Sequence, residues 1–428
     1  MQKSIQKFLF LTLIGVCITI SQTLAESPVK IFVTADHTDW VYKVNEKVKF
    51  KVVVTQNDKF LKNVEVVYEI GPEKMTPRIK ENTILKDGQL EMDGGSMNTP
   101  GFLRCTVKVE YNNIKYTGLA TAAFDPEKIV PTTTTPEDFS GFWKHAISEN
   151  KKIPLDPIMT LLPAKCTEKL NVYQINFQNY KYGMRVYGIL CVPKAPGKYP
   201  AILEVPGAGV RPYKGDTYLA EQGAITLQIG IHGIPVTLDS IVYANLKYGA
   251  LDGYPTSNMD NRDSYYYKHV YLGCVRAIDF IATLPEYDGQ NLAVSGGSQG
   301  GALTIATSAL DNRVKSLSCF FPALCDLTGY LNNRAGGWPG LYSNFPSQKF
   351  ETSKYYDTVN FAKLLNIPGF YSFGFNDETC PPTSMYSAYN SISAPKSLLI
   401  VKELGHYGVQ EQWAKSNEFL LRQLNIWK

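Results

Sequence analysis

The sequence predicts an all-β domain followed by a larger α/β domain built on a mostly parallel sheet. Up to about residue 124, short β-branched or alternating apolar runs follow one another with only turn-forming residues between them. From about residue 138, near-continuous apolar runs alternate with segments of helical spacing. That alternation is typical of a parallel sheet covered by helices on both faces. The length of 428 residues and a hydrophobic content of 44% fit a globular chain of two or three domains.

Residues 1–25 have the pattern of a secretory signal peptide. Lys3 and Lys7 give a positive start, an apolar core covers residues 8–20, and Ala25 provides a small residue at the cleavage point. The core is too short for a transmembrane helix, which needs about 20 residues. We therefore expect a periplasmic or secreted protein.

A lipid anchor is the weaker alternative for this leader. Cys17 would be the modified residue, but Val16 stands where lipoprotein signals usually have a small residue. No later segment is long and apolar enough to cross a bilayer. The sequence thus predicts no membrane span in the mature chain.

The charge is nearly balanced once the leader is removed. Residues 1–25 contain two lysines and no acid, so the net charge falls from +4 to +2 (4 − 2 = 2). This value gives no electrostatic reason to expect a nucleic acid or an anionic membrane as partner. A neutral substrate fits it better.

The cysteines predict buried thiols rather than a disulfide framework or a zinc site. Seven remain beyond the leader, an odd number at scattered spacing, and the one bridge left open joins Cys319 and Cys325. No metal-binding motif and no complete dinucleotide loop occur. We expect no cofactor and no metal.

Residues 26–127 are predicted to form an immunoglobulin-like β-sandwich, because about seven short strands fall within ~100 residues. His37, Trp40 and Tyr42 form either a sugar-binding face or, as the sequence favours, edge and core packing. Residues 128–137 are rich in proline and threonine and are predicted to be a linker.

Residues 138–428 begin with a helical segment over 139–152 and then contain eight predicted strands. The strands are expected at about 170–178, 184–193, 201–207, 224–231, 291–297, 316–322, 369–375 and 397–404. Helices between them are expected at 216–222, 266–284, 299–310 and 383–391. Eight strands with a serine directly after the fifth form the layout of an α/β-hydrolase.

Ser298 is the predicted nucleophile. It stands in Gly-Gly-Ser-Gln-Gly, residues 296–300, between an apolar strand and a helix. Small residues on both sides allow the strained turn that lifts a serine hydroxyl clear of the sheet. The alternative, an ordinary glycine-rich turn, explains the glycines but not this strand–turn–helix context.

The histidine and the acid are predicted from chain order. In this fold the order is serine, acid, histidine, and of five histidines only His406 follows Ser298. Asp377 lies just past the seventh predicted strand, where the acid belongs, and Glu378 beside it remains the competitor. In this interpretation His406 is the general base, and Asp377 orients it.

Two backbone N–H groups are expected to stabilise the oxyanion. One belongs to Gln299, the residue after the nucleophile. The other should come from the loop after the third strand, "EVPGAGV", at Ala208.

At this point the sequence resembles the acetyl xylan esterase and cephalosporin C deacetylase family over residues 136–428. The resemblance is carried by "PEDFSGFWK", by the stretch from "YYYKHVYLG" to "VSGGSQGGAL", and by "DETCPP" and "GH". It implies the α/β-hydrolase fold, the triad Ser298, Asp377 and His406, and oxyanion donors at Ala208 and Gln299.

The sequence departs from that family's pattern at three places. His232-Gly233-Ile234 stands for Arg-Gly-Gln, His406-Tyr407 for His-Glu, and Pro206-Gly207-Ala208 for His-Gly-Tyr. The family's ring-shaped oligomer is therefore not implied, and a homo-oligomer remains an open prediction. The N-terminal β-domain is an addition to the family's core.

The predicted function is that of an exported serine carboxylesterase which removes O-acetyl groups from plant cell-wall carbohydrate, xylan or its oligosaccharides. Its partner would be the acetylated carbohydrate. Trp338, in the insertion 326–360, and His232 are candidates for substrate contact, although packing is the alternative role for Trp338. Three alternatives remain: a peptidase of the prolyl oligopeptidase type, a glucuronoyl esterase, and a non-catalytic glycan-binding protein.

Overall fold

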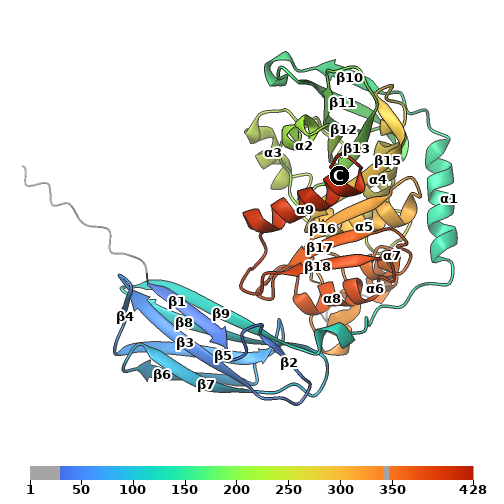
Figure 1. Ribbon diagram of the computed structural model, residues 1–428. Coiled ribbons are helices and arrows are strands. Elements are labelled where there is room, and N and C mark those ends of the chain that lie inside the picture. The colour runs from blue at the N-terminus through green and yellow to red at the C-terminus, as the bar shows by residue number, and fades with distance from the viewer. Residues whose placement is uncertain (1–28, 341–346, 428) are drawn as a thin grey trace, which may run out of the picture.

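A computed structural model describes residues 29–340 and 347–427 and contains two parts (Figure 1). Strands up to Phe124 form an all-β N-terminal region, called the β region below, and the rest forms a mixed sheet with helices. The predicted signal peptide lies outside the described residues. No helix within the described ranges is long and apolar enough to cross a membrane.

The β region contains two sheets. One has the order β1-β3-β4 with β7 also paired to β3, and the other has the order β2-β9-β8-β5-β6. Alternate residues of the long strands are buried, which gives one core between the sheets. The predicted two-sheet form is confirmed, while an immunoglobulin-like arrangement stays a prediction. The strands are β1 (Lys30–Ala35), β2 (Val41–Tyr42), β3 (Val48–Gln56), β4 (Lys59–Phe60), β5 (Val64–Pro72), β6 (Ile79–Leu85), β7 (Gln89–Gly95), β8 (Gly101–Tyr111) and β9 (Ile114–Phe124).

The idea of a sugar-binding face at His37, Trp40 and Tyr42 is wrong. Trp40 is 3% exposed and Tyr42 is 1% exposed, so both belong to the core. The Tyr42 hydroxyl donates to Asp36 Oδ1 at 2.6 Å, and the His37 ring stacks on Tyr42 with the ring centres 4.1 Å apart. These aromatic residues have a packing role, which is the interpretation that the sequence favoured.

The second sheet has nine strands in the order β10-β11-β12-β14-β13-β15-β16-β17-β18. Pairing is antiparallel from β10 to β14 along this order and parallel from β14 to β18. All eight predicted strands are present. The unpredicted one, β10, is an edge strand whose four residues are all exposed, so no buried face marks it in the sequence. The strands are β10 (Ile158–Leu161), β11 (Leu170–Asn179), β12 (Lys181–Pro193), β13 (Tyr199–Glu204), β14 (Ile225–Gly230), β15 (Tyr287–Gly297), β16 (Ser316–Phe320), β17 (Gly369–Phe373) and β18 (Lys396–Ile400).

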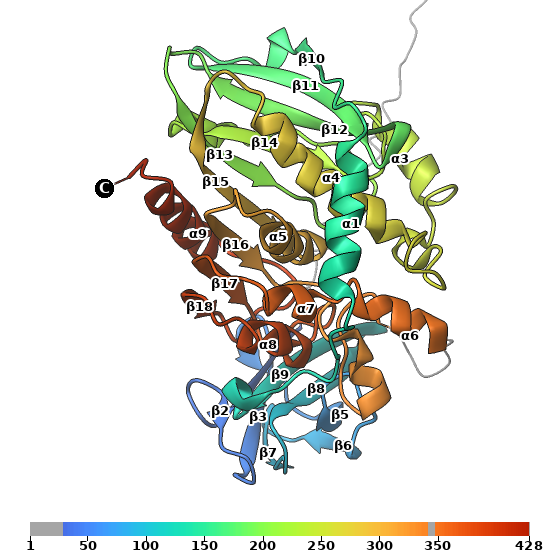
Figure 2. The same cartoon turned by 90° about the vertical axis from the view of Figure 1, so that its right-hand side faces the viewer.

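Helices cover both faces of this sheet (Figures 1 and 2). On one face, Leu219 and Leu420 pack with Ile202 and Ala293 of the sheet. The neighbouring sheet residues point to the opposite face and its larger core. The α-helices are α1 (Phe139–Lys151), α2 (Thr217–Glu221), α3 (Ser240–Lys247), α4 (Tyr266–Ile281), α5 (Gln299–Leu310), α6 (Ser347–Lys354), α7 (Thr358–Ala362), α8 (Pro382–Asn390) and α9 (Gln410–Gln423). Short 3-10 helices are η1 (Pro126–Lys128), η2 (Pro163–Lys165), η3 (Tyr254–Thr256) and η4 (Leu327–Asn332).

The five predicted helices are confirmed to within three residues at each end, but α3, α6, α7 and α9 were not predicted. The longest of these four is α9. Its buried residues are Gln412, Ser416, Leu420 and Leu421. Two of these are polar, so the apolar period of a helix is weak in this segment.

The segment predicted as a linker is tied to the α/β part. Asp326 Oδ1 accepts hydrogen bonds from the backbone N–H groups of Thr132 and Thr133 at 2.8 and 2.9 Å. Asn360 holds the next turn through the Thr135 hydroxyl and the Thr134 carbonyl. These bonds fix the connector against the α/β part.

The seven cysteines of the described chain are free thiols, so the bridge left open between Cys319 and Cys325 is wrong. Six are buried and Cys166 is half-buried. Over the same residues, no group of three His, Cys, Asp or Glu side chains is arranged to hold a metal ion.

Candidate active site

Ser298 occupies a strained turn between β15 and α5. Its φ of 62° and ψ of −126° lie outside the regions that side chains with a Cβ readily adopt. Gly296 and Gly300 allow the turn, because a Cβ on either would come within 2.6 Å of the Val205 carbonyl oxygen. The turn is held in place by the Ser298 N–H, which donates to the Phe320 carbonyl at 3.0 Å. This is the geometry that presents a serine hydroxyl above a sheet edge.

The structure brings the three predicted triad side chains into one hydrogen-bonded chain. The distance from His406 Nε2 to Ser298 Oγ is 2.8 Å, and that from His406 Nδ1 to Asp377 Oδ2 is 2.7 Å. Asp377 follows β17 and His406 follows β18, and carboxyl ends of parallel strands meet at one edge of a sheet. Because a carboxylate only accepts, Nδ1 carries the proton and Nε2 is free to accept from the serine. The arrangement can remove the hydroxyl proton of Ser298.

Asp377, and not Glu378, is the acid that the structure brings to His406. The Asp377 side chain is 0% exposed, and its Oδ1 accepts from the N–H groups of Thr379 and Cys380, both at 2.8 Å. Glu378 is exposed. Both oxygens of Asp377 are thus engaged, and its carboxylate has one orientation toward the imidazole.

The loop that was expected to supply an oxyanion donor lies beside the serine. A Cβ built on Gly207 would be 3.8 Å from Ser298 Cβ. Arg211 donates to the Gly207 carbonyl at 3.1 Å and to the Ala208 carbonyl at 3.0 Å. Since the C=O and N–H of one peptide group point in opposite directions, Arg211 fixes the orientation of the Ala208 N–H. In the described residues, no acceptor is found for the N–H groups of Ala208 and Gln299.

Comparison with known proteins identifies the family of this chain. Residues 126–423 match the family model described as "Acetyl xylan esterase (AXE1)". The chain belongs to this family. The predicted resemblance is confirmed, and the chain is a carbohydrate acetyl esterase of a serine hydrolase family.

Individual members of the family and solved structures agree with the match. The chain is 38% identical over 428 residues to "Acetyl esterase Axe7A" of Xylanibacter ruminicola, covering 97% of this chain and 95% of the relative. The acetyl xylan esterase from Paenibacillus sp. R4 is 28% identical, with a TM-score of 0.61, over 69% of this chain and 98% of that structure. Acetyl xylan esterase 1 from Thermoanaerobacterium sp. JW/SL YS485 shares the fold at 22% identity, with a TM-score of 0.61, over 70% of this chain and 97% of that structure. These two solved structures thus leave about 30% of this chain unmatched.

Three side chains that the sequence did not single out join the serine turn of this acetyl xylan esterase family member to its neighbours. Tyr254 and Tyr267 donate to Gln299 Oε1 at 2.8 and 2.6 Å. The Gln299 amide donates to the Pro206 carbonyl at 3.2 Å, and Arg211 holds the same loop. Only the tyrosine-rich run "SYYYK" hints at this network in the sequence, and its spacing assigns no partner.

His232 supports the oxyanion loop. Its Nε2 is 3.1 Å from the Gly209 carbonyl and its Nδ1 is 2.7 Å from the Tyr266 hydroxyl. Burial lowers the pKa of His232, so the ring is neutral, with Nε2 donating and Nδ1 accepting. Both nitrogens are engaged within the protein, and a contact of His232 with substrate stays a prediction.

Trp338 lies near the serine on the chain that follows β16. Its carbonyl accepts from the Leu324 N–H at 2.9 Å, and the adjacent Ala323 N–H donates to the Ser298 carbonyl at 3.0 Å. The indole is half-buried against the main core. Its packing role is therefore visible, while stacking on a sugar ring stays a prediction.

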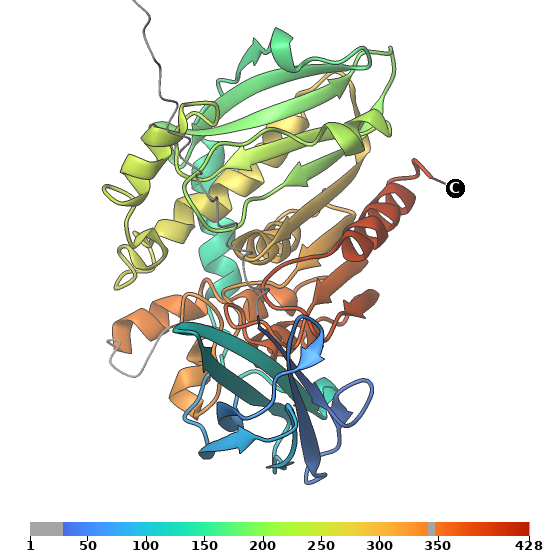
Figure 3. The same ribbon diagram turned by 90° about the vertical axis from the view of Figure 1, so that its left-hand side faces the viewer.

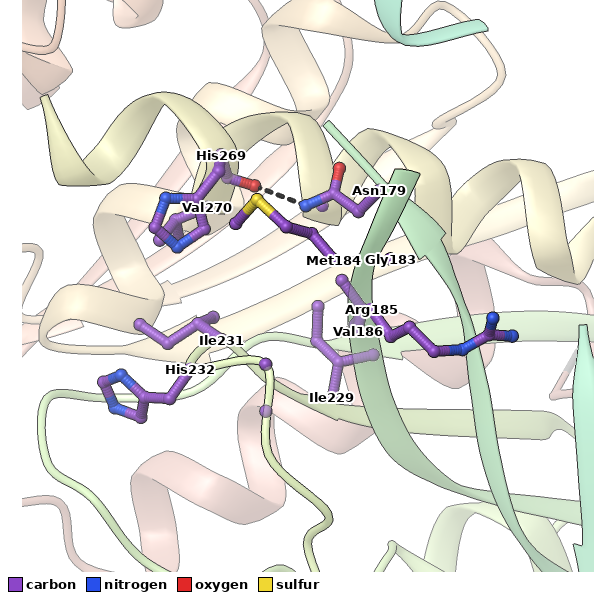
Figure 4. Close-up of a pocket in the computed structure, with 13 residues that line it drawn as sticks. Asn179, Gly183, Met184, Arg185, Val186, Ile229, Ile231, His232, His269 and Val270 are labelled. Atoms are coloured by element: carbon purple, nitrogen blue, oxygen red, sulfur yellow. Dashed lines mark hydrogen bonds between the residues drawn. The ribbon is translucent and has the colours of Figure 1, made fainter. Parts of the chain in front are cut away.

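His232 and His269 line a cavity of about 250 Å³ between β12, β14 and α4 (Figure 4). The His269 ring packs edge to face on Tyr266, with the ring centres 4.5 Å apart, and Asn179 donates to the His269 carbonyl at 2.8 Å. Burial lowers the pKa of His269 to about 4. The histidine is neutral in the folded protein at any pH well above 4.

The lowered pKa of His269 makes stability depend on pH. Between pH 6.5 and 4 the unfolded chain binds a proton at His269 that the folded chain does not, so the free energy of unfolding falls as the pH falls. From pH 8 to pH 4.5 we expect His269 to account for a loss of about 2 to 3 kcal/mol. Denaturant titrations at both pH values should show that His269→Gln loses about that much less stability than the wild type. Equal losses in the two proteins would contradict the prediction.

Proposed function

We propose that this protein is an exported serine esterase that removes O-acetyl groups from acetylated xylan or xylo-oligosaccharides. The observation that carries the proposal is the hydrogen-bonded chain of Ser298, His406 and Asp377 in a member of the acetyl xylan esterase family. Support for a xylan-type substrate comes from the family description and from the names of the similar proteins. Support for export comes from the leader pattern of residues 1–25.

The reaction runs through an acyl-enzyme. His406 takes the proton of Ser298, whose oxygen attacks the acetyl carbonyl, and Asp377 stabilises the imidazolium that forms. The imidazolium returns the proton to the sugar oxygen, which leaves as a free hydroxyl. Water, activated by the same histidine, then releases acetate from the serine.

The oxyanion of each tetrahedral intermediate is assigned to the N–H groups of Gln299 and Ala208. One such donor contributes about 3 kcal/mol to transition-state stabilisation in related chemistry. The anchoring of the loop by Arg211 and by the Gln299 amide keeps the donors in place before substrate arrives.

Acetate release tests this function. The wild type should release acetate from acetylated xylo-oligosaccharides and from p-nitrophenyl acetate, with Ser298→Ala as the blank for both. Hydrolysis of p-nitrophenyl acetate without acetate release from the oligosaccharides would support a serine esterase but exclude acetylated xylo-oligosaccharides as its substrate. Activity on neither ester would reject the proposed function and favour a glycan-binding protein.

A further inference from the structure

The β region packs directly on the loops that carry Asp377 and His406. Figures 2 and 3 show it beneath the β18 end of the catalytic sheet, next to α8. Arg104, in the first half of β8, reaches across this boundary. It lies 273 positions before Asp377 in the chain, and hydrogen bonds join the two residues.

Arg104 holds the backbone on both sides of Asn376. One terminal nitrogen of its guanidinium donates to the Phe375 carbonyl at 3.1 Å and to the Asp377 carbonyl at 3.0 Å. Its Nε donates to the Thr121 hydroxyl of β9 at 2.8 Å. The arginine is 6% exposed, so water does not compete strongly for these carbonyls.

Asn376 joins the same β region to the histidine loop. Its side-chain oxygen accepts from the Thr121 hydroxyl at 3.0 Å, and its amide donates to the Leu119 carbonyl of β9 at 3.1 Å. The side-chain amide also donates to the Glu403 carbonyl at 3.2 Å. The backbone N–H of Asn376 donates to the Leu404 carbonyl at 3.1 Å. The acid loop, the histidine loop and β9 are thus joined through one buried side chain.

Two further contacts hold the acid loop from the β region. Glu73 Oε1 accepts from the Thr383 N–H at 2.7 Å at the start of α8, and Glu73 Oε2 is 3.6 Å from the Arg104 guanidinium. The Phe102 ring meets the Phe375 ring edge to face, with the ring centres 5.2 Å apart. The segment from Phe375 to Thr383 therefore has a polar and an apolar support on the same side.

We propose that the β region is a structural part of the active site and that Arg104 is a positioning residue for Asp377. This inference rests on the proposed function, because it takes Asp377 as the acid that orients His406. Arg104 touches no reacting atom. It acts by fixing the peptide groups beside Asp377, and a shift of 1 Å in such a group can cost about 100-fold in rate.

The proposal predicts a loss in kcat that does not depend on the sugar. A β region that only bound glycan or spaced the enzyme would affect KM on polymeric substrate and leave hydrolysis of p-nitrophenyl acetate unchanged. With Arg104→Gln, we expect kcat to fall on the order of 100-fold on both p-nitrophenyl acetate and acetylated xylo-oligosaccharide, with little change in KM. Arg104→Lys, which keeps the positive charge and a single donor nitrogen, should restore part of the loss.

The matched control is Lys108→Gln. Lys108 lies four positions further along the same strand, is exposed and pairs with Glu69 of β5 at 3.1 Å. Its kcat should equal that of the wild type. All variants are to be assayed as full chains, well below their thermal unfolding midpoints.

A double-mutant cycle separates positioning from a general loss of stability. In the background of Asp377→Asn, Arg104→Gln should lower kcat by less than threefold, because the group that it positions is already gone. Should Arg104→Gln fail to fold, Thr121→Val removes the hydroxyl between Arg104 and Asn376 at nearly constant volume. That variant should lower kcat about tenfold.

The outcomes are distinct. Wild-type kcat in Arg104→Gln, or the full 100-fold loss repeated in the Asp377→Asn background, would overturn the positioning role and leave the esterase function intact. A wild type without esterase activity would remove the proposed function and this inference with it. An Asp377→Asn variant as active as the wild type would overturn this inference and leave the esterase function intact.

Discussion

Ser298→Ala is expected to lower kcat for acetate release by about 10⁶-fold, the scale seen when the nucleophile of a serine triad is removed. The Ser298 hydroxyl is the attacking group. It is the group that lies 2.8 Å from His406 Nε2, where the base can take its proton. The measurement is acetate release under single-turnover and steady-state conditions, with the folded state checked by circular dichroism.

Ser308→Ala is the matched control for this variant. Ser308 lies in α5, the helix that begins after the nucleophile, and its buried hydroxyl has no hydrogen-bond partner among the described residues. Removal of that hydroxyl should leave kcat within twofold of the wild type. Residual activity of Ser298→Ala above 1% would mean that another group attacks the ester.

Asp377→Asn is expected to lower kcat by about 10⁴-fold. The carboxylate now accepts from His406 Nδ1–H at 2.7 Å, which leaves Nε2 free to accept from Ser298. An amide group that donates toward Nδ1 favours the other tautomer, in which Nε2 carries the proton and cannot act as the base. A pH profile of kcat/KM for the variant and the wild type measures the effect.

Glu378→Gln separates the two acids that the sequence left as candidates. Glu378 is exposed, so its neutralisation should change kcat by less than twofold. A large loss in Glu378→Gln with an active Asp377→Asn would reverse the assignment of the acid.

The fold was predictable where local pattern and burial agree. The seven inner strands have apolar faces that the sheet buries, and the edge strand β18 has an apolar run that packs against the core; all eight were predicted at their correct places. β10 is exposed along its whole length, and α9 presents Gln412 and Ser416 to the core. Both elements form because a tertiary partner is already there, and their sequences do not show that partner.

The active site likewise contains residues that the sequence could predict and residues that it could not. Nucleophile and histidine were predictable because the turn at Ser298 needs glycine at 296 and 300 and because only one histidine follows in chain order. Loop supports such as Arg211, Tyr254 and Tyr267 were not predictable, since their spacing from Gln299 follows no helix or strand period.

The residue pattern was enough to predict the eight strands from β11 to β18, the serine turn and the order serine, acid, histidine, because these depend on local backbone chemistry and on chain direction. The folded structure was needed to choose between Asp377 and Glu378, since one residue along a loop separates a buried carboxylate from an exposed one. It also decided that the β region reaches the acid loop through Arg104, 273 positions away in the chain. A hydrogen bond between such distant residues depends on how two folded parts dock, and no local pattern records that docking.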